Sequence, residues 1–217
     1  MKFNLLESFP KINRENLIGT RTEKNRKLAR KFGKEFFDGE RINGYGGYIY
    51  DGRWIEVVHK MKERYNISPG DAVLDIGCGK GFLLHDIYSL TGGQVIPCGI
   101  DISEYAINNG MEIVKPFMVI GNCLKLPYAN KSFQCVVAIN TLHNLNKQDI
   151  KKAIKEMIRV CSKPKNMFIQ LDAFRNKEEE KRMKSFNLTA KTILSDKEWI
   201  KLFKEVGYKG DYYFTIP

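Results

Sequence analysis

A short apolar segment that runs into alternating glycines constrains this chain more than any other feature. Ala72-Val73-Leu74-Asp75-Ile76 has the composition of a strand buried on both faces, and Gly77-Cys78-Gly79-Lys80-Gly81 follows it directly. Glycine adopts backbone angles that other residues avoid, so this turn can bring the backbone close to a ligand. A helix expected from Phe82 to about Leu90 would present its free N–H groups at the same place.

Further apolar runs alternate with helical patterns along the rest of the chain. We expect strands at Val95–Asp101, Pro116–Ile120, Cys135–Ile139, Met167–Leu171 and Tyr212–Ile216. Ser103 can cap a short helix after the second strand, and apolar residues spaced three and four apart predict helices at 150–161 and 199–206. Such alternation predicts an α/β fold with a doubly wound, mostly parallel sheet, in which ligands bind at the carboxyl ends of the strands.

The chemistry of the turn limits the ligand. Its spacing is G-x-G-x-G, which differs from the dinucleotide pattern G-x-G-x-x-G, and the chain has no phosphate-binding P-loop. Asp75 would repel a bare phosphate but suits a ligand that carries an ammonium or sulfonium group. Asp101 ends the second strand, where a carboxylate can accept hydrogen bonds from the hydroxyls of a ribose.

These segments carry a resemblance to a known family. The stretches 73–81, 99–103, 121–128 and 132–145 resemble, in order and spacing, the successive motifs of class I S-adenosylmethionine-dependent methyltransferases. The resemblance covers roughly residues 72–172 and implies a Rossmann-like methyltransferase fold with S-adenosyl-L-methionine as its cofactor. The residues that it implies in cofactor binding are Asp75, Gly77, Gly79, Gly81, Asp101, Ile102, Asn122, Cys123 and Asn140.

The resemblance also implies a role for individual side chains. Asp75 would lie near the methionine ammonium, and Asp101 would hold the ribose. Asn122 and Cys123 would flank the adenine, and Asn140 would lie near the methyl-bearing end of the cofactor. Many relatives carry an aspartate at the position of Asn122, but an amide oxygen can also accept a hydrogen bond from the adenine amino group.

The part of the chain before the first expected strand has a different sequence pattern from the rest. We expect residues 1–68 to form an N-terminal helical lid and residues 69–217 to form the cofactor-binding α/β domain, with the turn Ser68–Asp71 between them. The stretch Glu23–Phe37 is expected to be helical, because its apolar residues recur at helical spacing: Leu28, Phe32 and Phe36.

A loop rich in glycine and tyrosine follows this expected helix. Tyr45, Tyr48 and Tyr50 could line the acceptor site as part of a lid, and Arg53 could bind a carboxylate or phosphate of the substrate. The alternative is that these aromatic residues only pack the loop onto the body of the protein. We favour the lid, because a core of this class leaves its acceptor side open.

Methyl transfer from a sulfonium depends mainly on alignment of the acceptor and exclusion of water. A general base is needed only when the acceptor loses a proton. His143, in the loop after the fourth strand, and Asp172, at the end of the fifth, are candidate catalytic residues together with Tyr48. The alternative for His143 is a loop residue that packs or caps.

The charge balance leaves several acceptors to be considered. With 36 lysines and arginines against 25 acidic residues, the formal net charge is +11. We favour methylation of a small molecule, with a mild preference for an anionic one, over an RNA methyltransferase, because Asn140-Thr141-Leu142-His143 replaces the Asn-Pro-Pro-aromatic motif and the basic residues are mixed with acids. Other uses of the sulfonium, such as aminocarboxypropyl transfer or cyclisation, remain open.

Other classes of protein are excluded or left open by composition. The five cysteines contain no CxxC pair, so we expect free thiols, a cytoplasmic location and no metal site. No apolar run approaches the ~20 residues of a membrane helix. Only one strand is evident after the last helix, where the family usually has an antiparallel hairpin, and Leu188–Leu194 could supply the other. The oligomeric state and the acceptor atom stay open.

Overall fold

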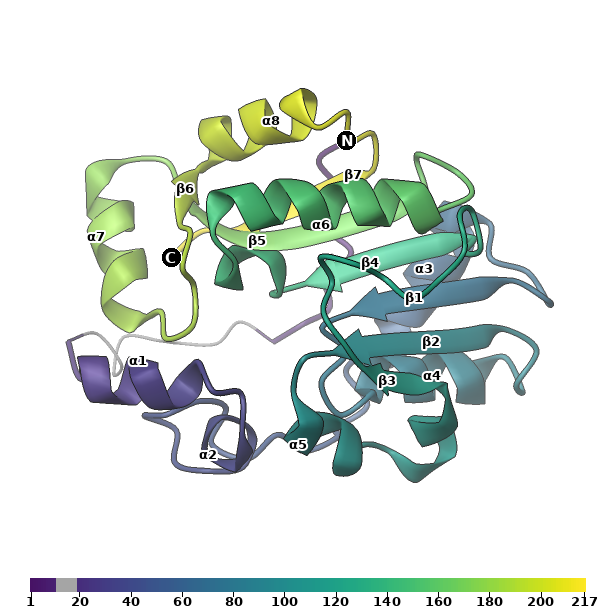
Figure 1. The fold of residues 1–217 in the computed structure, drawn as a ribbon, viewed down its shortest axis with the longest axis horizontal. Helices are drawn as coiled ribbons and strands as arrows, with labels where there is room; N and C mark the ends of the chain where they lie inside the picture. The colour runs from purple at the N-terminus through teal and green to yellow at the C-terminus, as the bar shows by residue number, and fades with distance from the viewer. Residues whose placement is uncertain (11–18) are drawn as a thin grey trace.

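The computed structural model describes residues 1–10 and 19–217, and its helices and strands alternate along most of the chain (Figure 1). The strands are β1 (Ala72–Ile76), β2 (Ile96–Asp101), β3 (Met118–Ile120), β4 (Cys135–Ile139), β5 (Met167–Phe174), β6 (Leu194–Ser195) and β7 (Asp211–Thr215). The helices are α1 (Glu23–Ala29), α2 (Lys34–Phe37), α3 (Ile55–Tyr65), α4 (Phe82–Leu90), α5 (Glu104–Asn108), α6 (Lys147–Val160), α7 (Lys177–Phe186) and α8 (Asp196–Glu205).

The strands form one parallel sheet, as the alternation predicts. Its order is β3-β2-β1-β4-β5, and both β6 and β7 pair with β5. Ile76 lies beside Ile100 on one side and Ala138 on the other, so β1, β2 and β4 end at the same edge. The strand order reverses between β1 and β4, which is where a doubly wound sheet binds its ligand.

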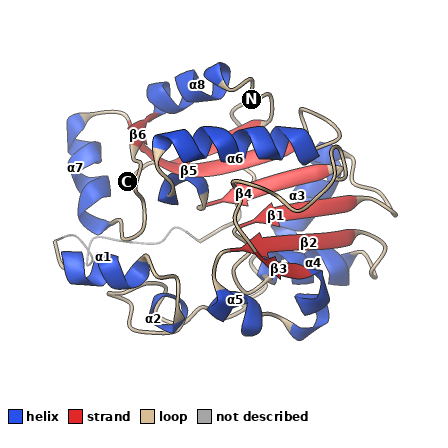
Figure 2. Ribbon diagram, viewed as in Figure 1, coloured by secondary structure: helices blue, strands red, loops and turns tan. Residues whose placement is uncertain are grey.

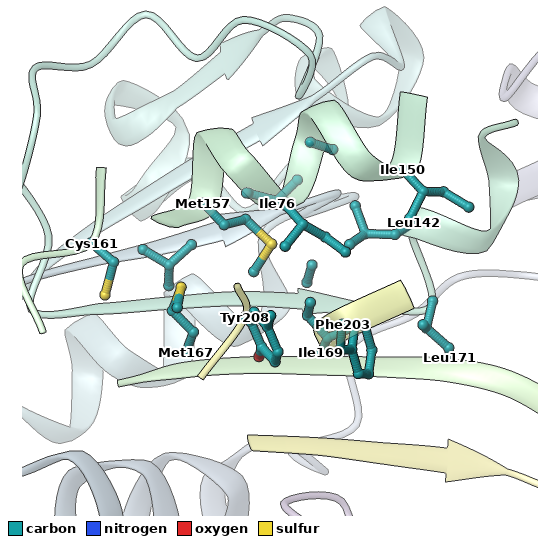
Figure 3. Close-up of a cluster of buried hydrophobic side chains, with 14 of the residues drawn as sticks. Ile76, Leu142, Ile150, Met157, Cys161, Met167, Ile169, Leu171, Phe203 and Tyr208 are labelled. Carbon is teal, nitrogen blue, oxygen red and sulfur yellow. The ribbon is translucent and has the colours of Figure 1, made fainter. Parts of the chain in front are cut away.

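Helices cover both faces of this sheet (Figures 1 and 2). Successive residues of a strand point to opposite faces, so Leu74 and Ile76 pack with α6 and α8, whereas Val73 packs with α3 and α4. Figure 3 shows the first of these cores, where Met157 of α6 and Phe203 of α8 lie among side chains of the sheet.

The N-terminal part of the chain contributes to two regions. Leu5 and α3 are buried against the sheet in the second core, and Lys2 bridges to Tyr212 of β7. Residues 21–50, which we call the cap, lie at the carboxyl ends of the strands and contain α1 and α2. Residues 11–18 of the predicted lid lie outside the described residues, and a domain boundary after residue 68 stays a prediction.

The single helix expected at Glu23–Phe37 is wrong. The first helix ends at Ala29, Phe32 has a left-handed φ of 50°, and α2 begins after Gly33. The break turns the chain back so that Phe36 packs edge-on against Tyr45, with ring centroids 5.1 Å apart. The helical spacing of the apolar residues therefore did not predict the break, which is accompanied by this aromatic contact between the two sides of the turn.

The strand expected at Pro116–Ile120 is shorter than its apolar residues suggest. A 3₁₀ helix occupies Glu112–Phe117, and only Met118–Ile120 pair with β2. Pro116 has no N–H to donate to a neighbouring strand, which explains why the strand begins after it.

The C-terminal part also differs from the expected pattern. β7 pairs with β5 in parallel, Phe168 opposite Asp211, and β6 pairs with the end of β5, so the described residues contain no antiparallel hairpin. The sequence pattern did not predict α7, because only Met183 and Phe186 of its residues are buried. Its N-terminus is capped by Asn176, whose side chain accepts from the Glu179 N–H.

The amphipathic helix α6 provides a test of the core. Ile154 is fully buried there and the neighbouring Lys155 is exposed. We expect Ile154→Ala to lower the free energy of unfolding by about 2–5 kcal/mol, because it leaves a cavity, and Lys155→Ala to change it by less than about 0.5 kcal/mol. Urea denaturation measures both, and equal effects of the two substitutions would contradict this packing.

Candidate active site

The glycine turn after β1 takes the conformation that its composition predicts. Gly77 and Gly79 have φ values of 81° and 55°. A Cβ at Gly77 would lie 2.1 Å from the Thr141 hydroxyl oxygen, and one at Gly79 would lie 3.2 Å from the Tyr48 ring. The turn is therefore enclosed between the loop after β4 and the cap, with no room for side chains at these two positions.

Asp101 connects this turn to the loop after β2. Its two carboxylate oxygens accept hydrogen bonds from the backbone N–H groups of Gly79 and Ser103, each at 2.8 Å. Burial raises the pKa of Asp101, while these backbone hydrogen bonds oppose the shift. Each oxygen has a second lone pair, so the carboxylate can still accept hydrogen bonds from a ligand in the cavity.

Asp75 lies beneath the turn and is 6% exposed. Loss of hydration raises its pKa to about 7, and the negative charge of Asp101 adds to the shift. Tyr48 lies over the same region; burial raises the pKa of its hydroxyl well above the ordinary value, and Tyr45 and Asp75 raise it further. The Tyr48 hydroxyl therefore stays protonated at neutral pH and can donate a hydrogen bond, but it is a poor base.

One cavity of about 430 Å³ joins the turn to the ends of β4 and β5. Cavities of several hundred Å³ are typical of small-molecule sites. The residues of the predicted site that line it are Tyr45, Tyr48, Gly77, Gly79, Asp101, Ile102, Asn122, Cys123, Asn140, His143 and Asp172. Asp75 and Gly81 are not among the lining residues: Asp75 is buried in β1, and Gly81 is the N-cap of α4.

The structure brings neither Tyr50 nor Arg53 to the cavity. The Tyr50 hydroxyl donates to Asp86 at 2.5 Å, which raises the pKa of Tyr50 to about 12. Arg53 pairs with Asp51 at 2.5 Å, and its guanidinium lies 5.6 Å from the centre of the Phe9 ring. Tyr50 has its partner on α4 and Arg53 has its partner in the same loop, and neither lines the cavity, so their predicted contact with substrate has no support from this geometry.

Several lining residues were not predicted. Thr141 and Asn144 belong to the loop that carries His143, so their positions next to a candidate residue could have identified them. Asn187 and Thr189 follow α7, and no sequence motif marks them. They reach the cavity because the long connection between β5 and β6 returns to the strand ends.

The cap is attached to the glycine turn by Lys80. The Lys80 ammonium lies 2.7 Å from the Asp38 carboxylate and donates to the Tyr48 carbonyl at 3.1 Å. Asp38 also accepts from the Tyr105 hydroxyl at 2.7 Å. Burial alone would raise the pKa of Asp38, but the hydrogen bonds from Lys80 and Tyr105 hold it below its usual value.

The other end of the cap is attached to α7. Arg26 donates to the carbonyls of Lys184 and Asn187, both at 3.2 Å, and Arg21 donates to the carbonyl of Phe186 at 2.5 Å. Carbonyls at the end of a helix lack partners within the helix and carry partial negative charge, which suits arginine donors. The cap thus extends from the side of α5 to α7 (Figure 1), and several of its residues line the cavity.

A polar group formed by His143, Asp172 and Asn187 lies at the β5 end of the cavity. His143 and Asp172 are 3% and 5% exposed. The His143 Nδ1 accepts from the Asp172 backbone N–H at 3.2 Å, so a neutral His143 ring carries its proton on Nε2.

One oxygen of the Asp172 carboxylate has no hydrogen-bond partner among the described residues. The Asn187 amide donates to Asp172 Oδ2 at 2.7 Å. Asp172 Oδ1 and Asn144 Oδ1 are enclosed and have no hydrogen-bond partner among the described residues. Unpaired buried acceptors are costly, and the residues that carry these two oxygens both line the cavity.

In this sheet the first strand runs into a glycine turn and the second ends in an acid bonded to that turn, an arrangement typical of α/β proteins that bind nucleosides. Residues 73–164 match the methyltransferase domain family. A demethylmenaquinone methyltransferase of Symbiobacterium thermophilum is 29% identical over 153 residues, which are 64% of this chain and 58% of that protein. A probable tRNA methyltransferase 9B of Mus musculus is 33% identical over 115 residues, 51% of this chain and 24% of that protein.

A solved structure is similar over most of the chain. A SAM-dependent methyltransferase from Aquifex aeolicus superposes with a TM-score of 0.52 at 20% identity, over 85% of this chain and 87% of that one. The chain spans 58% and 24% of the lengths of the two curated relatives above. Together, these matches show that residues 73–164 form a methyltransferase domain of the class I S-adenosylmethionine-dependent type, and the solved structure shows that the fold around it is shared.

The enclosed turn can be tested with two glycines of positive φ. We expect Gly77→Ala to lower the free energy of unfolding by about 2–4 kcal/mol, because the new methyl group combines backbone strain with overlap at Thr141. Gly92 has a φ of 57° and open space around it, so Gly92→Ala should cost only about 1 kcal/mol. Equal costs in urea denaturation would show that the turn is not enclosed.

Proposed function

We propose that this protein transfers the methyl group of S-adenosyl-L-methionine to a hydroxyl or amino group of a small, anionic molecule. The observation that supports this most is the single cavity that joins the glycine turn and Asp101 to His143 and Asp172. A donor bound at the first end and an acceptor bound at the second would meet inside one cavity, under the cap.

The residues at the first end fit the cofactor. Gly77 and Gly79 line the cavity, so the aminocarboxypropyl group could approach their backbone, and the Asp101 carboxylate would accept hydrogen bonds from the two ribose hydroxyls. Asn122, Cys123 and Ile102 line the same cavity beyond Asp101, where the adenine would lie. Asp75, beneath the turn, would interact with the ammonium through its negative charge.

When bound, the cofactor supplies a methyl group that the adjacent sulfonium already activates. The protein's own contribution is to exclude water with the cap and to orient the acceptor. Asp172 Oδ1 would accept a hydrogen bond from the acceptor's O–H or N–H and take its proton. Asn187 fixes the other carboxylate oxygen. His143 presents Nε2–H as a donor, so we assign it a positioning role ahead of a basic one.

Two alternatives have specific support. The similarity to a probable tRNA methyltransferase and the net charge of +11 favour an RNA acceptor, but the cavity is covered by a cap attached at both ends. Aminocarboxypropyl transfer or cyclisation would use the same cofactor site with a different carbon of the sulfonium.

We also propose a cytoplasmic location and a small-molecule partner. The five cysteines are free thiols, which agrees with a reducing compartment such as the cytoplasm. None of the helices in the described residues combines the length and the apolar character that crossing a bilayer requires. The partner that we propose is the small-molecule acceptor.

Product analysis separates these reactions. We expect the purified protein, incubated with S-adenosylmethionine labelled in the methyl group and a fractionated metabolite extract, to release S-adenosylhomocysteine and to label a small product. Methylthioadenosine as the product would favour aminocarboxypropyl transfer or cyclisation. Label recovered in RNA would favour the RNA acceptor, and no binding of S-adenosylhomocysteine by calorimetry would refute the proposed function.

Asp101 provides a direct test of cofactor binding. We expect Asp101→Ala to weaken S-adenosylhomocysteine binding by about 100-fold, because two charge-assisted hydrogen bonds to the ribose are lost. Glu104→Ala, an exposed acid three residues away, should change it by less than twofold. Isothermal calorimetry measures the affinities, and thermal denaturation confirms that both variants are folded. Equal affinities would contradict the assignment.

Asp75 makes both binding and stability depend on pH. Its pKa is about 7 in the fold and near 3.8 in an unfolded chain, so the folded protein holds an extra proton between these values. Its contribution to stability therefore falls as the pH rises from about 4 to about 7. Asp75→Asn has no such group, so we expect its free energy of unfolding, relative to that of wild type, to increase as the pH rises from about 4 to about 7.

Binding of a ligand ammonium should reverse this shift. Because the ammonium favours the ionised carboxylate, S-adenosylhomocysteine should release a proton from wild-type Asp75 at pH 6.5. Calorimetry in two buffers of different ionisation enthalpy measures this proton, which Asp75→Asn should not release. Identical proton release by the two proteins would show that Asp75 does not face the ammonium.

A further inference from the structure

A second hollow adjoins the cavity on its outer side. It has a volume of about 520 Å³ and lies between α1, the end of α7 and the segment 190–194. Three residues, Arg30, Asn187 and Lys191, line both this outer hollow and the cavity. The two spaces therefore meet at these residues, and a ligand that extends out of the cavity would pass them.

The charges along this route are predominantly positive. The acids that line the cavity are Asp101 and Asp172, both at strand ends, and the acid that lines the outer hollow is Glu23. The cationic residues that line one or both spaces are Arg21, Arg26, Arg30, Lys31, Arg41, Lys184 and Lys191. An anion would therefore be attracted to the cap side of the cavity.

Some of these cations already have strong partners. Arg26 and Arg21 bind carbonyls at the end of α7. Lys184 pairs with Glu180 at 2.5 Å, and Arg41 donates to the Gly44 carbonyl at 2.6 Å. Their charges are engaged in holding the cap and α7, so they contribute less to a ligand.

The remaining three lie where the two spaces meet or beside that point. Arg30 has one long contact with Glu23 at 3.4 Å, and its Nε is enclosed with no hydrogen-bond partner among the described residues. Lys191 and Lys31 are exposed and form no ion pair within that part of the chain. An arginine and two lysines without strong partners are suited to a phosphate or carboxylate.

We propose that Arg30 and Lys191, assisted by Lys31, form an anion site that binds a phosphate or carboxylate group of the acceptor, while the acceptor's hydroxyl or amino group lies at Asp172. This rests on the proposed function, because it places the site on the acceptor side of the same cavity. The substrate class is then a small molecule that carries a nucleophilic O–H or N–H and a separate anionic group.

The lining of the outer hollow favours a small anion over RNA. Proteins that bind single-stranded nucleic acid combine basic residues with aromatic side chains that stack on bases. The residues that line the outer hollow include no aromatic side chain; they are Glu23, Arg26, Arg30, Lys184, Asn187, Ala190, Lys191, Thr192, Ile193 and Leu194. The outer hollow thus offers charge for one or two anionic groups, whereas the aromatic side chains nearby, such as Phe32 and Phe36, line the adjoining cavity.

The test uses sodium tripolyphosphate as the probe and protein saturated with S-adenosylhomocysteine. Calorimetry first measures S-adenosylhomocysteine binding to wild type, Arg30→Gln, Lys191→Gln and the control Lys155→Gln, an exposed lysine on α6. We expect the same affinity in all four, because none of these residues lies at Asp101. Absence of S-adenosylhomocysteine binding to wild type would refute the proposed function itself.

The second titration tests the anion site alone. We expect tripolyphosphate to bind wild type and Lys155→Gln equally, and to bind Arg30→Gln and Lys191→Gln about tenfold more weakly, since each loses one charge-assisted contact. Absence of tripolyphosphate binding, or the same affinity in all four proteins, would overturn the site. The same titration is repeated with octauridylate. Octauridylate binding that is tighter than tripolyphosphate binding, and that Lys155→Gln weakens as much as Arg30→Gln and Lys191→Gln do, would overturn the small-molecule assignment in favour of RNA.

Discussion

The hydrogen bond between the Gly79 N–H and the Asp101 carboxylate is the interaction on which the rest of the site depends. It joins the loops after β1 and β2, which are neighbours in the sheet because of the parallel register between Ile76 and Ile100. The same turn carries Lys80, which binds the cap. One short segment therefore sets the position of a carboxylate, leaves space for a ligand and attaches the cover of the cavity.

The cap explains how a fold with an open edge can enclose a reaction. It is bound at one end by the Lys80–Asp38 ion pair and at the other by Arg21 and Arg26 at the end of α7. Its aromatic residues approach the turn closely, as the Tyr48 ring does at Gly79. Because water competes with the acceptor and weakens electrostatic interactions, such enclosure favours methyl transfer.

Much of the fold was predictable because its signals are local. The strand at Ala72–Ile76, the glycine turn and the helix at Phe82–Leu90 follow from composition and spacing within twenty residues, and the structure confirms them. The break at Phe32 and the parallel pairing of β7 were not predictable, because they depend on contacts with distant residues. Phe36 meets Tyr45 only after the chain has turned back, and Asp211 meets Phe168 only in the assembled sheet.

The candidate site was predictable in its strand-end residues and less so in its cap. Asp101, Asn140 and Asp172 lie at or near the carboxyl ends of β2, β4 and β5, so the sheet brings them to one edge. Tyr50 and Arg53 have the right composition for a substrate site, but a loop sequence does not show which way its side chains face, and theirs face the body of the protein. The cations that reach the cavity, Arg30 and Lys191, stand in segments without a motif.

Part of the excess of basic residues behind the net charge of +11 lies at the cavity. Several basic residues are paired within the fold, including Arg159 with Glu156 and Lys151 with Glu205. Those without strong partners at Arg30, Lys31 and Lys191 lie on the acceptor side of the cavity. The net positive charge, which is also compatible with an RNA acceptor, thus agrees with the small anionic acceptor that we propose.

A crystal structure of the protein grown with saturating S-adenosylhomocysteine tests the central claim most directly. We expect electron density for the ligand in the cavity, with its ribose hydroxyls on Asp101, its adenine beside Asn122 and its amino acid end at Gly77 and Gly79. Density at another place, or an orientation that leaves Asp101 without contact to the ribose, would contradict the account.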